Sequence, residues 1–181
     1  MKFIAVDGVG DPNTSAAYAM ALELLYGLSY TIKMTNKTVL DYVVPPLEGF
    51  WNLPADYHDN SLSIDKNTFA WTALIRQPEF VDNDIFAAAL LALTKKKPEL
   101  DMSLPRLVSL TEGVCVQIMH IGSYDDEPAT IARMIAFVIE AGYAIDISQT
   151  RRHHEIYLSD PRRTAAEKLK TIIRYPIRKN D

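Results

Sequence analysis

Two short, largely apolar runs, far apart in the chain, are closely alike. The run 3–10 (FIAVDGVG) can be laid over the run 115–122 (CVQIMHIG), and both end at a glycine. A short apolar run that is bounded by a turn is typical of a buried β-strand, and glycine often marks the end of a strand. Polar turns at 11–14 and 123–128 follow the two runs and contain residues that favour helix starts. The sequence therefore predicts two copies of a strand followed by a helix.

Both predicted helices have apolar residues three or four positions apart, which places these residues on one face of a helix. We expect each helix to stop near a glycine, Gly27 or Gly142, and a strand to follow it at 30–32 or 144–147. The residues on the predicted buried faces are Tyr18, Leu22 and Leu25 in the first helix and Ile131, Met134, Ile135 and Val138 in the second.

A third strand completes each copy. The run 71–78 matches the run 154–161 when their final prolines are aligned. Before its third strand the first copy carries a long segment, 33–68, which is rich in aromatic residues, prolines and aspartates and which we interpret as an insertion and a candidate lid. A further helix is predicted over 82–97 and a closing strand over 170–175.

Two β-α-β-β units related by a pseudo-twofold axis predict an α+β fold. Helices would cover one face of an antiparallel sheet, and the other face would offer a ligand groove. We expect a single domain, 1–181, made of a first half, 1–98, and a second half, 112–178. Neither half alone offers both a helix layer and enough sheet to bury a core.

The composition and net charge of the chain exclude or disfavour several classes of function. The chain has 181 residues, of which 48% are hydrophobic and 23% charged, as in globular proteins. It has no apolar stretch near the roughly 18 residues of a membrane-spanning helix, and its one cysteine, Cys115, cannot form an internal disulfide. A net charge of −4 disfavours phosphate backbones as partners. We expect a cytoplasmic protein with neither nucleic acid nor membrane as a partner, and the oligomeric state stays open.

The densest cluster of titratable residues lies on the predicted strand after position 152. Alternation places His153, Glu155 and Tyr157 on one face. We expect the other face to meet the helices, so that Glu155 and Tyr157 project into the groove. Aromatic surroundings there would raise the pKa of the Glu155 carboxyl toward the range of a general base. The alternative is a surface glutamate paired with Arg151 or Arg152. The opposite face carries His154, Ile156 and Leu158.

Large aromatic residues are candidates for the walls of a binding site. Trp51 and Trp71 are the largest, and Phe50, Tyr57 and Tyr124 lie near predicted ends or in the insertion. Each of these rings is also a candidate for the hydrophobic core.

A metal site is the weaker interpretation of the histidines. His120, His153 and Glu155 form a two-histidine, one-carboxylate set of the kind that binds transition metals, but the local spacing of known metal motifs is missing. We expect no metal and no cofactor, and expect His120 to form hydrogen bonds within the groove. The sequence has no phosphate-binding glycine loop and no nucleophile elbow, and Cys115 lies in mid-strand. Covalent catalysis is therefore not expected.

Four runs of sequence resemble the GyrI-like small-molecule-binding proteins, and the resemblance covers almost the whole chain. The runs are 42–51, 112–124, 153–163 and 170–174. The chain looks closest to a stand-alone subfamily, the cyclopropanoid cyclopropyl hydrolases. These enzymes add water to the strained cyclopropane ring of DNA-alkylating natural products such as yatakemycin.

The resemblance implies an aromatic cage around a flat, largely apolar ligand, with a glutamate at its centre. The implied function is hydrolysis of cyclopropanoid xenobiotics, which protects the cell. Binding or sequestration of aromatic or cationic xenobiotics without catalysis is the alternative, and inhibition of DNA gyrase by protein contact is a third option that only the family name suggests. The residues carried over are Glu155 and Tyr157 as catalytic residues and Phe50, Trp51 and Trp71 as ligand-binding residues. We expect His120 to be a further ligand-binding residue, and expect Tyr157 or His120 to donate a hydrogen bond to the phenolate that forms on the ligand.

Overall fold

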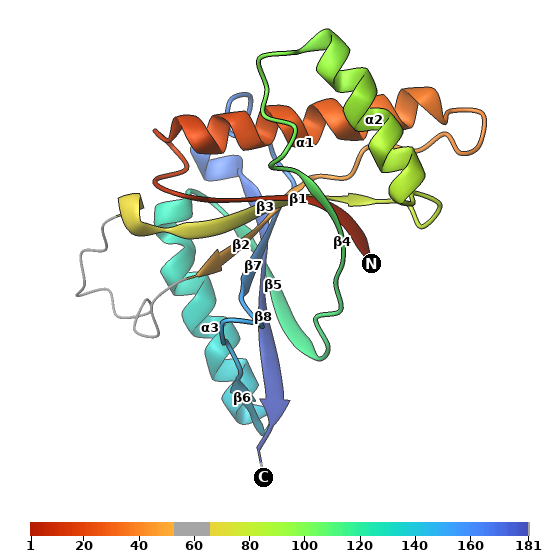
Figure 1. Ribbon diagram of the computed structural model, residues 1–181. Helices are drawn as coiled ribbons and strands as arrows, with labels where there is room; N and C mark the ends of the chain where they lie inside the picture. The colour runs from red at the N-terminus through yellow and green to blue at the C-terminus, as the bar shows by residue number, and fades with distance from the viewer. Residues whose placement is uncertain (53–65, 181) are drawn as a thin grey trace. The chain divides into compact units, whose positions relative to one another are not determined.

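The computed structural model describes residues 1–52 and 66–180. The chain has an α+β fold, and its described part contains three α-helices and eight strands, with antiparallel pairing within each unit (Figure 1). The described residues divide into two units. The first unit holds residues 1–47 and 66–111, and the second holds residues 48–52 and 112–180.

The first unit is built on three strands. β1 (Lys2–Val9) lies between β3 (Ala70–Gln77) and β4 (Arg106–Ser109). α1 (Ala16–Thr35) packs on β1 and β3, and α2 (Asn83–Lys96) packs against α1. The helix predicted over 82–97 is therefore confirmed as α2.

α1 is longer than the sequence pattern predicts. It begins after Ser15, whose side chain accepts a hydrogen bond from the backbone N–H of Tyr18. It then continues past Gly27, so the strand predicted at 30–32 is wrong. A Cβ atom at Gly27 would lie 3.0 Å from Cδ2 of Leu93 on α2. The glycine therefore allows the two helices to approach closely and does not end the first one.

The second unit holds the other strands. β2 (Leu47–Asn52) pairs with β7 (His153–Tyr157), β7 pairs with β8 (Lys170–Lys179), and β8 pairs with β5 (Cys115–Ile121). The short β6 (Tyr143–Ile145) pairs with the far end of β8. This arrangement makes β7 an inner strand with a neighbour on each side.

α3 (Glu127–Glu140) supplies the helical part of the core of the second unit. Ile131 and Met134 of this helix pack with Ile173 and Tyr175 of β8. The buried stripe predicted for this helix is therefore confirmed. A 3₁₀ turn, η2 (Tyr124–Asp126), leads directly into α3 and brings its side chains to the N-terminal end of the helix.

The predicted order of elements occurs twice, although with partly different strands from those that the sequence predicts. Strand, helix, strand and strand follow one another as β1-α1-β2-β3 and again as β5-α3-β7-β8, with β6 added to the second copy. The first strand pairs with the last in each copy, so β3 corresponds to β8. The match between 71–78 and 154–161 is therefore wrong. The interpretation of 33–68 as an insertion is wrong in part, because it contains the end of α1 and all of β2. Residues 53–65 of that segment lie outside the described residues.

Candidate functional site

His153, Glu155 and Tyr157 lie on one face of β7, as the alternation of the sequence predicts. The hydroxyl of Tyr157 donates a hydrogen bond of 2.7 Å to Oε2 of Glu155. Nε2 of His153 lies 2.8 Å from Oε1 of the same carboxyl group, without the alignment of a hydrogen bond. The Glu155 side chain is only 12% exposed, and each of its oxygens has a polar neighbour.

The face of β7 that carries Glu155 is the face covered by α3. Glu155 is opposite Ile173 in the register of β7 and β8, and residues opposite each other in an antiparallel pair share a face. Ile173 packs with Met134 of α3. The ring of His153 lies 4.9 Å from the ring of Tyr175, which belongs to the same core. The expectation that Glu155 and Tyr157 point away from the helices is therefore wrong.

Trp51 extends this cluster from β2. Its indole N–H donates a hydrogen bond of 3.0 Å to the hydroxyl oxygen of Tyr157. Gly49, which is opposite Glu155 in the register of β2 and β7, makes this contact possible. A Cβ atom at Gly49 would lie 2.9 Å from Nε1 of Trp51 and 3.1 Å from the Tyr157 hydroxyl oxygen. A chain of hydrogen bonds thus runs from Trp51 through Tyr157 to Glu155.

Tyr124 brings a further ring from the turn before α3. The ring stands edge-on to that of Tyr157, with 6.0 Å between centroids and 86° between planes. Burial and the negative charges of Glu155, Glu127 and Asp160 raise the pKa of Tyr124 to about 12. Its phenol therefore stays neutral at physiological pH.

Glu127, the first residue of α3, is a site residue that the sequence reasoning missed. It is 6% exposed, and its Oε1 has no hydrogen-bond partner among the described residues. Burial, followed by the negative charges of Glu155 and Asp125, raises the pKa of Glu127 to about 9. A signal was present in the sequence, because Glu127 lies one helical turn before Ile131 and so belongs to the buried stripe of the helix.

Two carboxyl groups therefore interact electrostatically with each other and with the Tyr124 phenol. Glu155 accepts a hydrogen bond, and Glu127 keeps its proton at neutral pH. A pair of this kind supplies a proton acceptor and a proton donor to one site. We call the following residues the Glu155 cluster: Trp51, Tyr124, Glu127, His153, Glu155 and Tyr157.

Phe50 lies on the opposite face of β2 from Trp51 and does not join the Glu155 cluster. Its ring is 4.3 Å from the ring of His154, tilted by 31°. The guanidinium carbon of Arg152 lies 5.0 Å from the centre of the Phe50 ring, at cation–π distance. The structure therefore separates Phe50 from Glu155, although the sequence reasoning placed both around one ligand.

His154 is the centre of a buried polar network on that opposite face. Its Nε2 is 2.8 Å from Oε2 of Glu48, and its Nδ1 is 2.8 Å from Oε1 of Glu112. Burial alone would lower the pKa of His154, but the hydrogen bonds and charges of Glu112 and Glu48 raise it overall. Arg174 binds the other oxygen of Glu112 at 2.6 Å. The prediction that His154 meets the helices is wrong, because α3 covers the other face of β7.

His120 lies on β5 and is engaged within the protein. Its Nδ1 is 2.9 Å from the hydroxyl of Thr130 on α3, and its Nε2 is 2.8 Å from the carbonyl oxygen of Ser123. Both ring nitrogens therefore have partners, one on α3 and one in the turn before it, and these contacts hold the start of α3 against β5.

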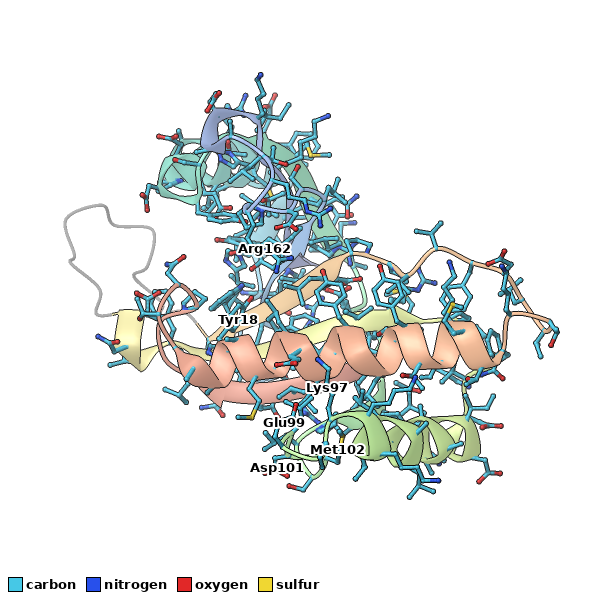
Figure 2. All side chains as sticks on the ribbon, turned by 90° about the horizontal axis from the view of Figure 1, so that it is seen from above. Tyr18, Lys97, Glu99, Asp101, Met102 and Arg162 are labelled. Atoms are coloured by element: carbon cyan, nitrogen blue, oxygen red, sulfur yellow. The ribbon has the colours of Figure 1, made fainter. Side chains whose placement is uncertain are left out.

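Trp71 belongs to the core of the first unit. It is 2% exposed, its ring lies over Gly8 of β1, and the ring of Tyr18 stands edge-on to it at 4.9 Å. Figure 2 shows Tyr18 on α1. A ligand-binding role for Trp71 stays a prediction, and Tyr57, the other aromatic candidate, lies outside the described residues.

The described residues were compared with the requirements of a metal site and of a membrane-spanning helix. Among the histidines, cysteines, aspartates and glutamates that the structure describes, no three are grouped so that they could hold a metal ion. In residues 1–52 and 66–180, no helix has both the length and the hydropathy needed to span a membrane.

Comparison with known proteins identifies one family, together with solved structures at high and at low sequence identity. Residues 1–178 match the model of the GyrI-like small-molecule-binding domain. None of the curated proteins matches the chain. A solved structure of an uncharacterized conserved protein from Listeria innocua is 42% identical, with a TM-score of 0.89, and the match covers 98% of this chain and 88% of that one.

Two further structures extend the comparison. A hydrolase from Listeria innocua is 41% identical, with a TM-score of 0.85 and coverage of 98% of this chain and 87% of that one. The C-terminal domain of EcmrR is 10% identical, with a TM-score of 0.54 and coverage of 99% and 92%. At that identity, EcmrR shares the fold alone.

Proposed function

Because the chain belongs to the GyrI-like family of small-molecule-binding domains, we propose that it binds flat aromatic molecules and hydrolyses the cyclopropane ring of cyclopropanoid DNA-alkylating compounds. The observation that carries this proposal is the Glu155 cluster, in which a nearly buried carboxyl group lies beside aromatic rings. The similarity to a hydrolase from Listeria innocua supports an enzymatic function. In a cell, the reaction would remove alkylating agents before they reach DNA.

In the proposed reaction, Glu155 orients a water molecule and takes one of its protons. The water oxygen bonds to the cyclopropyl carbon as a carbon–carbon bond of the ring breaks. The electron pair of that bond moves through the conjugated system onto the carbonyl oxygen, which becomes a phenolate. Because the strained ring is already electrophilic, the step needs a positioned base and no covalent enzyme intermediate.

The neighbours of Glu155 give it a defined orientation for this step. The hydroxyl proton of Tyr157 is directed at Oε2, so Tyr157 fixes the carboxyl group and its proton is not directed at the ligand. Tyr124, which is 37% exposed, offers apolar surface for a flat ligand, and the nearly buried Trp51 would be reached by a ligand that enters the cluster. Aromatic contacts typically add about 0.5–1.5 kcal/mol each. Phe50 and Trp71 are not needed for the step, and their roles as ligand-binding residues stay predictions.

Binding without catalysis is the second candidate function. A carboxylate beside aromatic rings is also a binding site for cationic aromatic molecules, which would pair with Glu155 and stack on Trp51 or Tyr124. Such a protein would protect by sequestration and would return the ligand unchanged.

Turnover of a cyclopropanoid alkylator by wild type and by Glu155→Gln distinguishes these functions. We expect wild type to convert many equivalents to a product heavier by one water, as measured by mass spectrometry. Glu155→Gln should bind the compound with kcat lower by about 10²–10⁴-fold, the usual contribution of a general base. The matched control is Glu167→Gln at an exposed position, which should keep full turnover. If wild type and Glu155→Gln both bind and neither reacts, the protein is a binding module.

A further inference from the structure

We infer that Glu127 is the general acid of this site and that it gives its carboxyl proton to the phenolate oxygen formed when the ring opens. The inference rests on the proposed function, because it names a second catalytic residue for the same reaction. A reaction that adds water and collects negative charge on an oxygen needs a proton donor as well as a base.

The first reason is that the two donors that the sequence suggests, Tyr157 and His120, are engaged. Tyr157 directs its hydroxyl proton at Glu155. His120 has both ring nitrogens within hydrogen-bond distance of Thr130 and Ser123. These contacts leave Glu127 as the acidic group of the cluster whose oxygen has no partner among the described residues.

The second reason is the position of Glu127. It occupies the first turn of α3 on the buried stripe that faces the sheet, and it interacts electrostatically with Glu155 of β7. Asp125 of η2 adds a second negative charge, and Tyr124 of the same turn is a neutral phenol. A buried oxygen without a partner in the protein indicates strain, a function, or a bound water or ion.

The third reason is the coupling between the two carboxyl groups. While Glu155 carries a negative charge, it disfavours a second charge on Glu127, so Glu127 keeps its proton. When Glu155 takes a proton from water, this repulsion disappears and Glu127 becomes a stronger acid. The donor is therefore activated at the moment when the phenolate needs a proton.

The proton balance closes over one cycle. Water gives one proton to Glu155 and its hydroxide to the cyclopropyl carbon, the broken ring bond supplies the electron pair on the oxygen, and Glu127 protonates that oxygen. The cycle ends with Glu155 protonated and Glu127 ionised. Transfer of one proton from Glu155 to Glu127 through solvent restores the starting state, so the net reaction consumes the ligand and one water.

The test is the pH dependence of turnover in wild type, Glu127→Gln and Glu127→Asp, with Glu140→Gln at the exposed end of α3 as the matched control. We expect kcat of wild type to fall on the alkaline side as Glu127 loses its proton. Glu127→Gln should bind the compound, lose about 10²-fold in kcat and lack this alkaline fall. Glu127→Asp keeps a carboxyl group and should recover part of the rate together with the alkaline fall.

A second measurement does not depend on activity. A carboxyl group whose folded pKa lies above its unfolded pKa destabilises the folded state as pH rises between the two values. The free energy of unfolding of wild type should therefore fall relative to that of Glu127→Gln between pH 5 and 8. Parallel curves for the two proteins would overturn the inference, because Glu127 would then be ionised at neutral pH.

The outcomes separate the inference from the proposed function. If wild type turns over the compound and Glu127→Gln matches it in kcat and pH profile, Glu127 is not the acid, although the hydrolysis stands. If wild type does not react at any pH, the hydrolysis and the acid role both fail.

Discussion

The hydroxyl of Tyr157 links Trp51 to Glu155 through two hydrogen bonds, and it can be removed while the ring is kept. In Tyr157→Phe the ring stays and both hydrogen bonds are lost. We expect the free energy of unfolding to fall by about 1–3 kcal/mol, the usual cost of losing a bond to a charged group. We also expect kcat to fall about tenfold or more, because Glu155 is no longer held in one orientation.

Tyr30→Phe is the control for Tyr157→Phe, since Tyr30 is 53% exposed on α1. It should change neither stability nor turnover. Unfolding by denaturant and steady-state kinetics measure both effects. A Tyr157→Phe enzyme as active as wild type would show that the hydroxyl does not orient the base.

Gly49 is required by the close approach of two side chains. In Gly49→Ala the new methyl group meets Nε1 of Trp51 and the hydroxyl of Tyr157. We expect a loss of about 1–3 kcal/mol in the free energy of unfolding, as for other overpacked sites.

The effect of Gly49→Ala should shrink in a Trp51→Phe background, because the indole nitrogen is gone. A double-mutant cycle measured by thermal unfolding gives the coupling between the two positions. Strictly additive effects would contradict the close contact.

At the scale of elements, the sequence predicts which residues share a face of β7 but not which face meets the helix. Alternation alone groups His153 with Glu155 and Tyr157, and the structure agrees. The opposite set contains Ile156 and appears more apolar, yet its His154 is held by carboxylates. Since neither face of this strand is uniformly apolar, the alternation does not predict which of the two faces the helix covers.

The network around His154 predicts a pH dependence of stability. The folded pKa of His154 is raised, so its stabilising effect is complete below the unfolded value of about 6.5 and is lost as pH rises through the folded pKa. Burial alone would raise the pKa of Glu112, but the hydrogen bond from His154 and the charge of Arg174 lower it overall. The contribution of Glu112 to stability is therefore lost only as pH falls through its folded pKa. The network therefore stabilises the fold most in mildly acidic solution.

We expect the free energy of unfolding of wild type to fall above pH 6.5 more steeply than that of His154→Gln, by up to about 1.4 kcal/mol per pH unit. Chemical denaturation across a pH series measures this slope. Glu127 also makes the free energy of unfolding depend on pH, but it does so equally in wild type and in His154→Gln. If His154→Gln does not fold, an NMR titration of the His154 ring in wild type gives the same test. An apparent pKa below 6.5 would contradict the network.

At the scale of the whole molecule, a bound ligand should stabilise the fold. A ligand at about 100 times its dissociation constant adds about 2.7 kcal/mol to the free energy of unfolding. We expect the hydrated product of a cyclopropanoid to raise the Tm of wild type and to raise that of Trp51→Ala much less.

The control for Trp51→Ala is Phe137→Ala, because Phe137 is 62% exposed on α3. This variant should retain the full ligand-induced shift in Tm. Equal shifts for Trp51→Ala and wild type would exclude Trp51 from the binding site.

The sequence alone predicts the fold class, the duplicated order of elements, and the grouping of Glu155 with Tyr157. It does not predict the end of α1, because Gly27 looks like a helix stop and acts as a contact point with Leu93. It also misses Glu127, whose burial depends on how α3 is seated on the strands of its unit. Side-chain partners across strands come from register, which alternation within one strand does not contain.

The most direct test of a reacting site at Glu155 is a crystal structure of Glu155→Gln with an intact cyclopropanoid. We predict that the cyclopropyl carbon lies beside residue 155 on the α3 face of β7, in contact with Trp51 or Tyr124. We also predict that the carbonyl oxygen lies within hydrogen-bond distance of Glu127. A ligand bound on the opposite face, against Phe50 and His154, would contradict a reaction at Glu155.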